Sequence, residues 1–257
     1  GYVMPNLTAH LGMAKDAASR IDHPTVSNNM GALLLGSVSP DIRIVTKASR
    51  DDTHFVGLDF QLSGEGLSTM FQEYPHLGKH GNNSGATQAF IIGYASHLFA
   101  DEKWILDFYR PYFGNRKVFN TPEHGDLMDR AFQLELDRRE NTGVGGIRVL
   151  HPLLACAEHG VNIDFIPPDV MTEWRKWVQS ALDWEFSWER LRFMARRIMS
   201  RNPDYSEEKM DFFLEQFFLL NSNGIESVYE FVPQSDLDVY REKIMDFVLE
   251  FAQEYLS

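Results

Sequence analysis

His97 and Asp101 are the pair of residues whose types and spacing first point to chemistry. They lie four residues apart in segment 88–104, where apolar positions recur with a period near 3.6 residues and predict an amphipathic helix. Residues four apart share one face of a helix, so an imidazole nitrogen and a carboxylate oxygen would lie where one small cation contacts both. A direct hydrogen bond between the two side chains inside a helical core is the alternative that this spacing leaves open.

Three more residues of cation-binding types lie near predicted helix ends or turns: His10, Asp41 and His54. Neutral imidazole nitrogens and carboxylate oxygens are ordinary ligands of Zn²⁺ and similar ions. A bridging carboxylate such as Asp101 is able to hold two cations roughly 3.5–4 Å apart, as two-metal phosphoester hydrolysis requires. The chain has nine histidines, however, and chance alone produces such dispersed sets.

The elements that must position these residues are helical. No strand-period alternation of any length appears, so the sequence predicts an all-α fold. Region 57–87 is the longest irregular stretch, and 111–122 is expected to be a loop. The expected helices are 7–21, 25–38, 67–74, 88–104, 123–140, 147–159 with an interruption at Pro152, 171–201, 205–220 and 235–256.

The length of 257 residues favours one all-α domain covering 1–257. Within it, we expect the metal-site helices to occupy 4–140 and an aromatic-rich helical part, 147–257, to pack on them. Hydrophobic residues make up 44% of the chain, which is enough for a sizeable core. The aromatic positions of the last hundred residues are therefore expected to be core, with a lipid-facing or partner-facing groove as the alternative.

Charge and cysteine content limit the partners and the compartment. The formal net charge of −13 disfavours a general nucleic-acid binder, because an acidic surface repels polyanions. The single cysteine, Cys156, excludes an internal disulfide and fits a reducing compartment; we expect it to pack as a small apolar residue. No apolar run of 18 residues and no signal-peptide pattern are visible, so we expect a cytoplasmic protein without a transmembrane segment.

Four motifs occur in a fixed order: Met-Pro-x-x-x-x-His at 4–10, Gly-x-x-x-Pro-Asp at 36–41, Thr-His-Phe at 53–55 and Gly-Tyr-x-x-His-Leu-x-x-Asp at 93–101. Together they resemble the zinc-dependent phospholipase C superfamily, and most of all its intracellular bacterial branch. The resemblance covers roughly 4–105. The same superfamily includes the P1-type nucleases, and it implies an all-α protein that holds zinc among its helices and hydrolyses phosphoesters.

The resemblance also implies a role for each candidate residue. His97, His54 and Asp41 match ligands of a first ion, Asp101 matches a bridging carboxylate, and His10 with Asp101 matches the ligands of a second ion. An attacking water would lie between the ions, and Asp41 would orient or deprotonate it, which makes Asp41 the candidate catalytic residue. The expected substrate is a small-molecule or lipid phosphoester.

The sequence also departs from the family pattern. Secreted members use an N-terminal Trp as a ligand, whereas residue 1 here is Gly and no Trp precedes Trp104. Their third ion needs another His soon after the bridging Asp, and here none occurs before His124. His124 and Glu135 are eleven residues apart, three helical turns, and are the tentative ligands of a degraded third site. We therefore expect one or two ions, Zn²⁺ or another divalent metal.

Three functions remain at this point. The first is a metal-dependent phosphoester hydrolase that acts by water attack on a phosphodiester or phosphomonoester. The second is a catalytically inactive metal- or ligand-binding protein of the same fold. The third, an HD-type phosphohydrolase, ranks last because the sequence has no His-Asp dipeptide. We adopt the zinc-dependent hydrolase as the working prediction.

Overall fold

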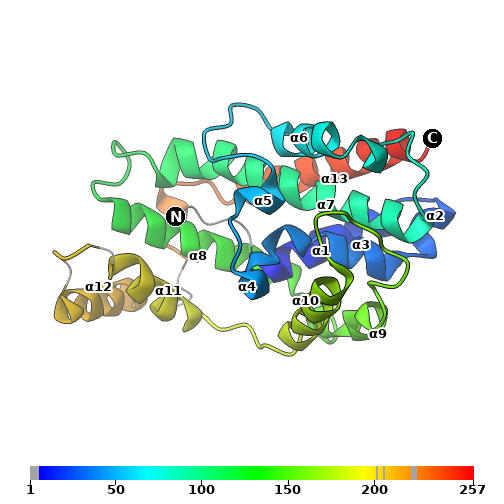
Figure 1. The fold of residues 1–257 in the computed structure, drawn as a ribbon. Coiled ribbons are helices and arrows are strands. Elements are labelled where there is room, and N and C mark those ends of the chain that lie inside the picture. Colours follow the sequence, from blue (N-terminus) through cyan, green and yellow to red (C-terminus); the bar gives the residue numbers. More distant parts are fainter. Residues whose placement is uncertain (1–5, 201, 205, 221–224) are drawn as a thin grey trace.

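The computed structural model describes residues 6–200, 202–204, 206–220 and 225–257 (Figure 1). Across these residues every named element is a helix, and β structure is limited to an isolated antiparallel bridge between Ile163 and Ile166. The predicted all-α fold is therefore confirmed. Met4 and Pro5 of the first motif, and the predicted helix start at Tyr205, lie outside the described residues.

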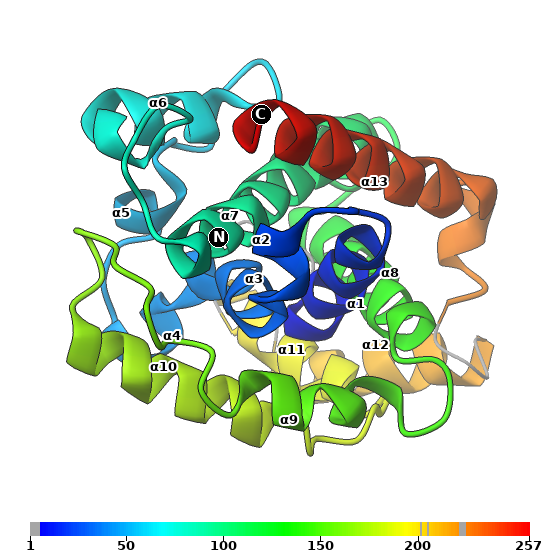
Figure 2. The ribbon, with the colours of Figure 1, turned by 90° about the vertical axis from the view of Figure 1, so that its right-hand side faces the viewer.

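Two of the helices that carry candidate ligands, α1 with His10 and α7 with His97 and Asp101, lie in the middle of the array. In Figure 2, α1, α3 and α7 occupy the centre, with α9 and α10 on one side and α13 on the other. The α-helices are α1 Leu7–Ser19, α2 Pro24–Ser27, α3 Met30–Gly36, α4 Arg43–Thr46, α5 Asp51–His54, α6 Glu65–Glu73, α7 Gly85–Trp104, α8 Pro122–Glu140, α9 His151–Leu154, α10 Pro168–Ala181, α11 Arg190–Met199, α12 Glu207–Leu220 and α13 Ser235–Tyr255. The shorter elements are the 3₁₀ turns η1 Ser39–Asp41, η2 Pro75–Leu77, η4 Gly146–Leu150 and η5 Val228–Glu230, and the π-helix η3 Ile105–Phe113.

The central helix α7 is buried around its whole circumference. Fifteen of its twenty residues are buried, because α1, α3, α6 and α13 all pack against it. The hydroxyl of Ser84 caps its start by accepting a hydrogen bond from the backbone N–H of Thr87 at 3.1 Å. The prediction of a helix in this segment is correct. The prediction that it is amphipathic is wrong, because neighbouring helices cover every side of it and leave no face open to solvent.

Two glycines allow α3 and α7 to pack closely. A Cβ atom added at Gly36 would overlap the backbone carbonyl of Phe90, and one added at Gly93 would overlap the carbonyl of Leu33. Glycine is the residue that allows two backbones to approach this closely. This contact fixes where the C-terminal half of α7 lies relative to the end of α3.

Two predictions about where helices begin and end are wrong, one for residues 25–38 and one for residues 111–122. The expected helix 25–38 is divided into α2 and α3, because Asn29 turns its side chain back to donate to the carbonyl of Thr25 at 2.8 Å. The expected loop 111–122 is helical as far as Phe113 and includes Pro111 in the π-helix. A π-helix is wider than an α-helix and moves the preceding carbonyl away from the proline ring, which relieves the usual clash.

The C-terminal part is more interrupted than the sequence suggested. The expected helix 171–201 consists of α10 and α11, and the expected helix 147–159 consists of η4 and α9. Pro152 does not interrupt α9, because it occupies the first turn, where a missing N–H is tolerated. Trp174 and Tyr240 are buried as expected, whereas Phe193 is exposed. Cys156 is also exposed, so the expectation that it packs in the core is wrong.

Candidate metal centre

The structure brings five predicted site residues together from four segments that are distant in the sequence. His10 ends the first turn of α1, Asp41 ends η1 and His54 ends α5. His97 and Asp101 lie one turn apart on α7. We call these five residues the histidine–carboxylate cluster.

Asp101 is at the centre of this cluster. Its Oδ2 atom lies 3.0 Å from Nε2 of His54 and 3.5 Å from Nε2 of His97, and its Oδ1 atom lies 3.3 Å from Nε2 of His10. The carboxylate oxygens of Asp41 lie 3.9 Å from Nε2 of both His54 and His97. The rings of His10 and His97 stack with centroids 3.8 Å apart. Three imidazoles therefore aim the same nitrogen, Nε2, at a pair of carboxylates.

Hydrogen bonds on the outer side of the rings determine which nitrogen carries hydrogen. Nδ1 of His97 lies 2.8 Å from the carbonyl oxygen of Ser37, and Nδ1 of His54 lies 3.1 Å from the carbonyl oxygen of Arg50. A carbonyl oxygen only accepts, so both Nδ1 atoms must be donors. In the neutral form, Nε2 of each ring is then left with a lone pair directed at the cluster, which is the arrangement typical of metal-binding histidines.

The donor atoms fit a divalent cation. Nε2 of His10, Nε2 of His97 and Oδ1 of Asp101 are buried without a partner in hydrogen-bonding geometry. Lone pairs of imidazole and carboxylate repel one another at such distances unless protons or a cation lie between them. Ligands of a tetrahedral zinc ion lie about 3.4 Å from one another, given bonds of about 2.1 Å. The observed nitrogen–oxygen separations of 3.0–3.9 Å in the cluster are close to this value.

Two overlapping groups of these atoms each lie within 4.8 Å of one another: His10, Asp41 and His97, and His54, His97 and Asp101. His97 belongs to both groups. The cluster therefore offers two candidate ligand groups that share His97, and the number of ions it holds stays a prediction.

Burial and charge act against each other in the cluster. Burial lowers the pKa of His10 and of His54, because the charged imidazolium is deprived of water. Burial would also lower the pKa of His97, but the nearby Asp101 carboxylate outweighs it, and the net shift is upward. The pKa of Asp101 itself lies well below its usual range, because the three histidines outweigh the cost of burial. Two of the three imidazoles are thus held neutral, as metal ligands must be.

The side chain of Asp41 is the part of the cluster that solvent reaches. It is 25% exposed, whereas the side chains of His10, His54, His97 and Asp101 are at most 1% exposed. A water or substrate that reaches the cluster from solvent therefore meets Asp41 before it meets the imidazoles.

Two charged residues next to the cluster were not predicted from the sequence. Nη2 of Arg50 lies 3.7 Å from Oδ2 of Asp101. The carboxylate of Glu102 accepts hydrogen bonds from the backbone N–H groups of Gly64 and of Gly66, the latter at 2.8 Å. Glu102 thereby attaches the start of α6 to α7. The only sequence signals were their positions, four residues before His54 and directly after Asp101.

The tentative third site is not formed by His124 and Glu135. The ring of His124 packs against Phe119 and Phe213. Glu135 is bound by Arg138 at 2.7 Å and by a second arginine in the next position. Eleven residues of helix also separate the two by about 16 Å, so they share a face but no ion. This expectation is wrong, because facing the same side does not bring side chains within ligand distance.

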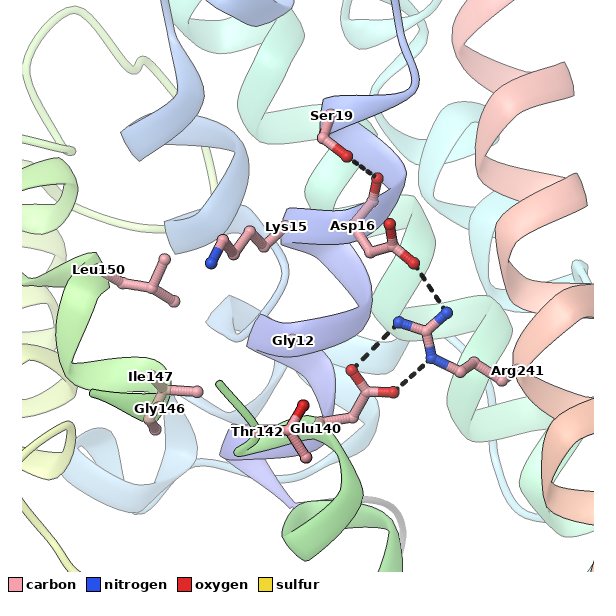
Figure 3. Close-up of a pocket in the computed structure, with 10 residues that line it drawn as sticks. All are labelled: Gly12, Lys15, Asp16, Ser19, Glu140, Thr142, Gly146, Ile147, Leu150 and Arg241. Atoms are coloured by element: carbon pink, nitrogen blue, oxygen red, sulfur yellow. Dashed lines mark hydrogen bonds and ion pairs between the residues drawn. The ribbon is translucent and has the colours of Figure 1, made fainter. Parts of the chain in front are cut away.

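A separate hollow of about 260 Å³ lies beside the other face of α1 (Figure 3). Its lining includes Lys15, Asp16, Glu140 and Arg241, and none of the cluster residues. The guanidinium of Arg241 is held by Glu140 at 2.5 Å and by Asp16 at 2.8 Å. Figure 3 shows these ion pairs joining α1, α8 and α13, and we assign the hollow a structural role.

The fold and the cluster define a class: a helical protein with a buried histidine–carboxylate cluster whose donor atoms fit a metal ion. Residues 9–102, which make up less than half of the chain, match the family model of zinc dependent phospholipase C. The matched stretch contains all five cluster residues and ends before His124. This part of the chain is therefore similar to zinc-dependent phospholipases C.

Comparisons with curated proteins and with solved structures gave no significant match. Among the described residues, no helix combines the length and the apolar character that crossing a membrane requires.

Proposed function

We propose that the protein is a zinc-dependent hydrolase that uses water to cleave a phosphodiester or phosphomonoester of a lipid or a small molecule. The observation that carries this proposal is the convergence of His10, His54 and His97 on Asp101, with Asp41 at the solvent-facing side. The match to the zinc dependent phospholipase C family supports it.

The family resemblance suggests which residues would hold zinc. His54, His97 and Asp41 match the ligands of one ion, and His10 and Asp101 match those of a second ion. A bound Zn²⁺ lowers the pKa of water and neutralises charge that develops on phosphoryl oxygens.

Asp41 would act as the general base. Its carboxylate faces the cluster and is also partly exposed, so it is placed to accept a proton from a water molecule that attacks the phosphorus atom. Hydrogen bonds to backbone carbonyls fix the orientation of the His97 and His54 rings. The two imidazoles therefore keep their positions relative to Asp41 during the proton transfer.

The test combines metal content with turnover of bis(p-nitrophenyl) phosphate. We expect purified protein to contain zinc by elemental analysis, and Asp101→Asn to lose both zinc and activity. Asp41→Asn should lower kcat by about 10²- to 10⁴-fold, the usual contribution of a general base. The matched control is Asp164→Asn, because Asp164 is half-exposed and pairs with His76 on the surface.

Absence of zinc would contradict the proposal. Bound zinc without hydrolysis of phosphodiesters or phosphomonoesters would instead favour the inactive metal-binding protein of the same fold.

A further inference from the structure

Thr53 is a buried polar residue beside the cluster that the metal chemistry described above does not use. It lies directly before His54 on α5. Its hydroxyl oxygen is 2.7 Å from the carbonyl oxygen of Pro40 and 3.1 Å from that of Arg50. A hydroxyl has one proton to donate, and the carbonyl of Pro40 is the nearer acceptor, so we assign the hydrogen bond to Pro40.

This hydrogen bond joins two elements that carry cluster residues. A threonine in a helix is able to donate to the carbonyl three or four residues earlier, which here belongs to Arg50. The nearer acceptor, Pro40, lies instead in η1, directly before Asp41. The hydroxyl of Thr53 therefore ties the turn that ends in Asp41 to the helix that ends in His54.

The same hydroxyl oxygen also faces the ring of His54. It lies 3.4 Å from Nδ1, and this nitrogen carries hydrogen, because it also donates to a backbone carbonyl. A hydroxyl oxygen accepts as well as donates. Thr53 thus contacts the imidazole of His54 as an acceptor and the backbone next to Asp41 as a donor.

A second buried hydroxyl fixes Thr53 relative to α7. The phenol of Tyr94 donates to the backbone carbonyl of Thr53. Tyr94 lies three residues before His97, so the two side chains are neighbours on α7. The two hydroxyls therefore form a chain from α7 through α5 to η1, and these three elements supply His97, His54 and Asp41.

The chain bears on the position of the Asp41 carboxylate. Its oxygens lie 3.9 Å from Nε2 of His54 and 3.9 Å from Nε2 of His97, although Asp41 shares a helix with neither residue. The element that carries Asp41 is a 3₁₀ turn of three residues, which has little hydrogen bonding of its own. A hydrogen bond from a neighbouring helix to this turn therefore helps to hold the carboxylate at ligand distance from both imidazoles.

We propose that Thr53 is a positioning residue for the metal centre. Its hydroxyl sets the distance of Asp41 from His54 and His97 and so increases the affinity for zinc, and Tyr94 holds Thr53 in place. The inference rests on the proposed zinc-dependent function, but it requires only zinc binding and not turnover.

The experiment measures zinc affinity by competition with a chromophoric chelator, and ligand geometry by the visible absorption of the protein loaded with Co²⁺. Thr53→Val keeps the shape of the side chain and removes the hydroxyl, and Thr53→Ser restores the hydroxyl. Thr87→Val is the matched control. The buried hydroxyl of Thr87 accepts from the backbone N–H of Asn162 at 2.9 Å, about 15 Å along α7 from His97.

We expect Thr53→Val to raise the zinc dissociation constant by about 10- to 100-fold, the usual effect of losing a group that orients a metal ligand, and to change the Co²⁺ spectrum. Thr53→Ser should bind zinc within about threefold of wild type and keep the wild-type spectrum. Thr87→Val should lose thermal stability without zinc, as Thr53→Val should, because each loses a buried hydrogen bond. Its zinc affinity should nevertheless stay within about twofold of wild type.

Tyr94→Phe tests the other end of the chain. We expect it to raise the zinc dissociation constant by about 3- to 30-fold, because the carbonyl of Thr53 loses its donor. Tyr255→Phe is the matched control, because the buried hydroxyl of Tyr255 donates to the carbonyl of Leu77 at 2.7 Å, away from the cluster. Zinc affinity of Tyr255→Phe should equal that of wild type.

Zinc affinity of folded Thr53→Val within about twofold of wild type would overturn the inference. An equal loss of affinity in Thr87→Val would also overturn it, because the effect would then follow stability alone, and so would a loss of affinity in Thr53→Ser as large as that in Thr53→Val. If circular dichroism shows that Thr53→Val does not fold, Tyr94→Phe decides: affinity equal to wild type overturns the inference.

Hydrolysis of bis(p-nitrophenyl) phosphate separates the two proposals. Zinc affinity that depends on Thr53, in a protein without hydrolysis, contradicts only the proposed function. Zinc-dependent hydrolysis in a protein whose zinc affinity does not depend on Thr53 contradicts only the inference.

Discussion

His97 is tied to the end of α3, because its Nδ1 donates to the backbone carbonyl of Ser37 at 2.8 Å. Ser37 is the C-cap residue of α3, where carbonyl groups lack helical partners. The imidazole satisfies one such carbonyl, and in return its Nε2 is directed at Asp101. The position of this ligand therefore depends on how closely α3 and α7 pack.

Gly93→Ala should disturb this contact. In an exposed helix the change would stabilise by about 1 kcal/mol. Here the added methyl group would overlap the carbonyl of Leu33, so we expect destabilisation by about 3 kcal/mol and weaker zinc binding as His97 moves. Urea denaturation and zinc titration measure the two effects. Gly85→Ala, at the first turn of the same helix, meets the side-chain amide of Asn29 at 3.1 Å and no backbone carbonyl, so it should cost much less stability; equal stability of both variants would contradict the packing argument.

His54→Ala should remove one ligand from the cluster and leave Asp101 without its closest nitrogen. We expect the zinc dissociation constant to rise at least about 100-fold, measured by competition with a chromophoric chelator. His76→Ala is the control, because His76 is exposed and pairs with Asp164 at 2.8 Å away from the cluster. Equal zinc affinity of the two variants would show that His54 is not a ligand.

Zinc should also stabilise the wild-type protein against unfolding. At a free concentration of 100 times the dissociation constant, the gain is about 2.7 kcal/mol, or roughly 5–10 °C in Tm for a chain of this size. The same zinc concentration should shift the Tm of His76→Ala equally and that of His54→Ala by less than a degree or two. A shift of equal size in His54→Ala would place the stabilising ion elsewhere.

The sequence was sufficient to predict the all-α fold and five residues that meet, because each lies in a local motif with its own spacing. His97 and Asp101 share a helical face by geometry alone. The meeting of His10 with that pair depends on tertiary packing, and the family resemblance, rather than periodicity, indicated it. The match over residues 9–102 confirms the resemblance, while the roles of the individual residues remain predictions.

Other features had no signal that periodicity detects. The burial of α7 on every side comes from contacts with helices that are distant in the sequence. The apolar periodicity of its own residues therefore indicated a solvent-exposed face that α7 does not have. Arg50 precedes His54 by one turn, but nothing local shows that the guanidinium folds back toward Asp101. His124 and Glu135 show a different error. The two residues face the same side of one helix, but eleven residues of helix separate them along its axis.

Glu102→Ala should loosen α6 without affecting the metal. The carboxylate of Glu102 accepts from the N–H groups of Gly64 and Gly66, which would lose their acceptor. We expect a loss of about 2–4 kcal/mol in the free energy of unfolding and faster hydrogen exchange in 64–73, with unchanged zinc content. Glu73→Ala, an exposed position on the same helix, should change stability by less than about 0.5 kcal/mol. Unaltered exchange in Glu102→Ala would mean that the two hydrogen bonds do not hold the start of α6.

Asp129 should make stability depend on pH. Its carboxylate is buried and accepts from Nε1 of Trp104 and Nε2 of Gln133, both at 2.8 Å. Burial nevertheless raises its pKa to about 7, because these hydrogen bonds do not replace the lost water. Between about pH 4 and 7 the folded state therefore binds a proton that the unfolded state has released, and stability falls as the pH rises.

Asp129→Asn removes this titration and keeps a side chain of the same shape. At about 1.36 kcal/mol for each pKa unit, the unfolding free energy of wild type should fall relative to the variant by about 4 kcal/mol between pH 4 and 7. Burial also raises the pKa of Asp137 to about 7, but Asp137 is present in both proteins and cancels in the difference. Denaturant titrations at several pH values measure the effect, with Asp246→Asn, an exposed position on α13, as the control. A difference between wild type and Asp129→Asn that stays constant over this pH range would show that the buried carboxylate is already ionised at pH 4.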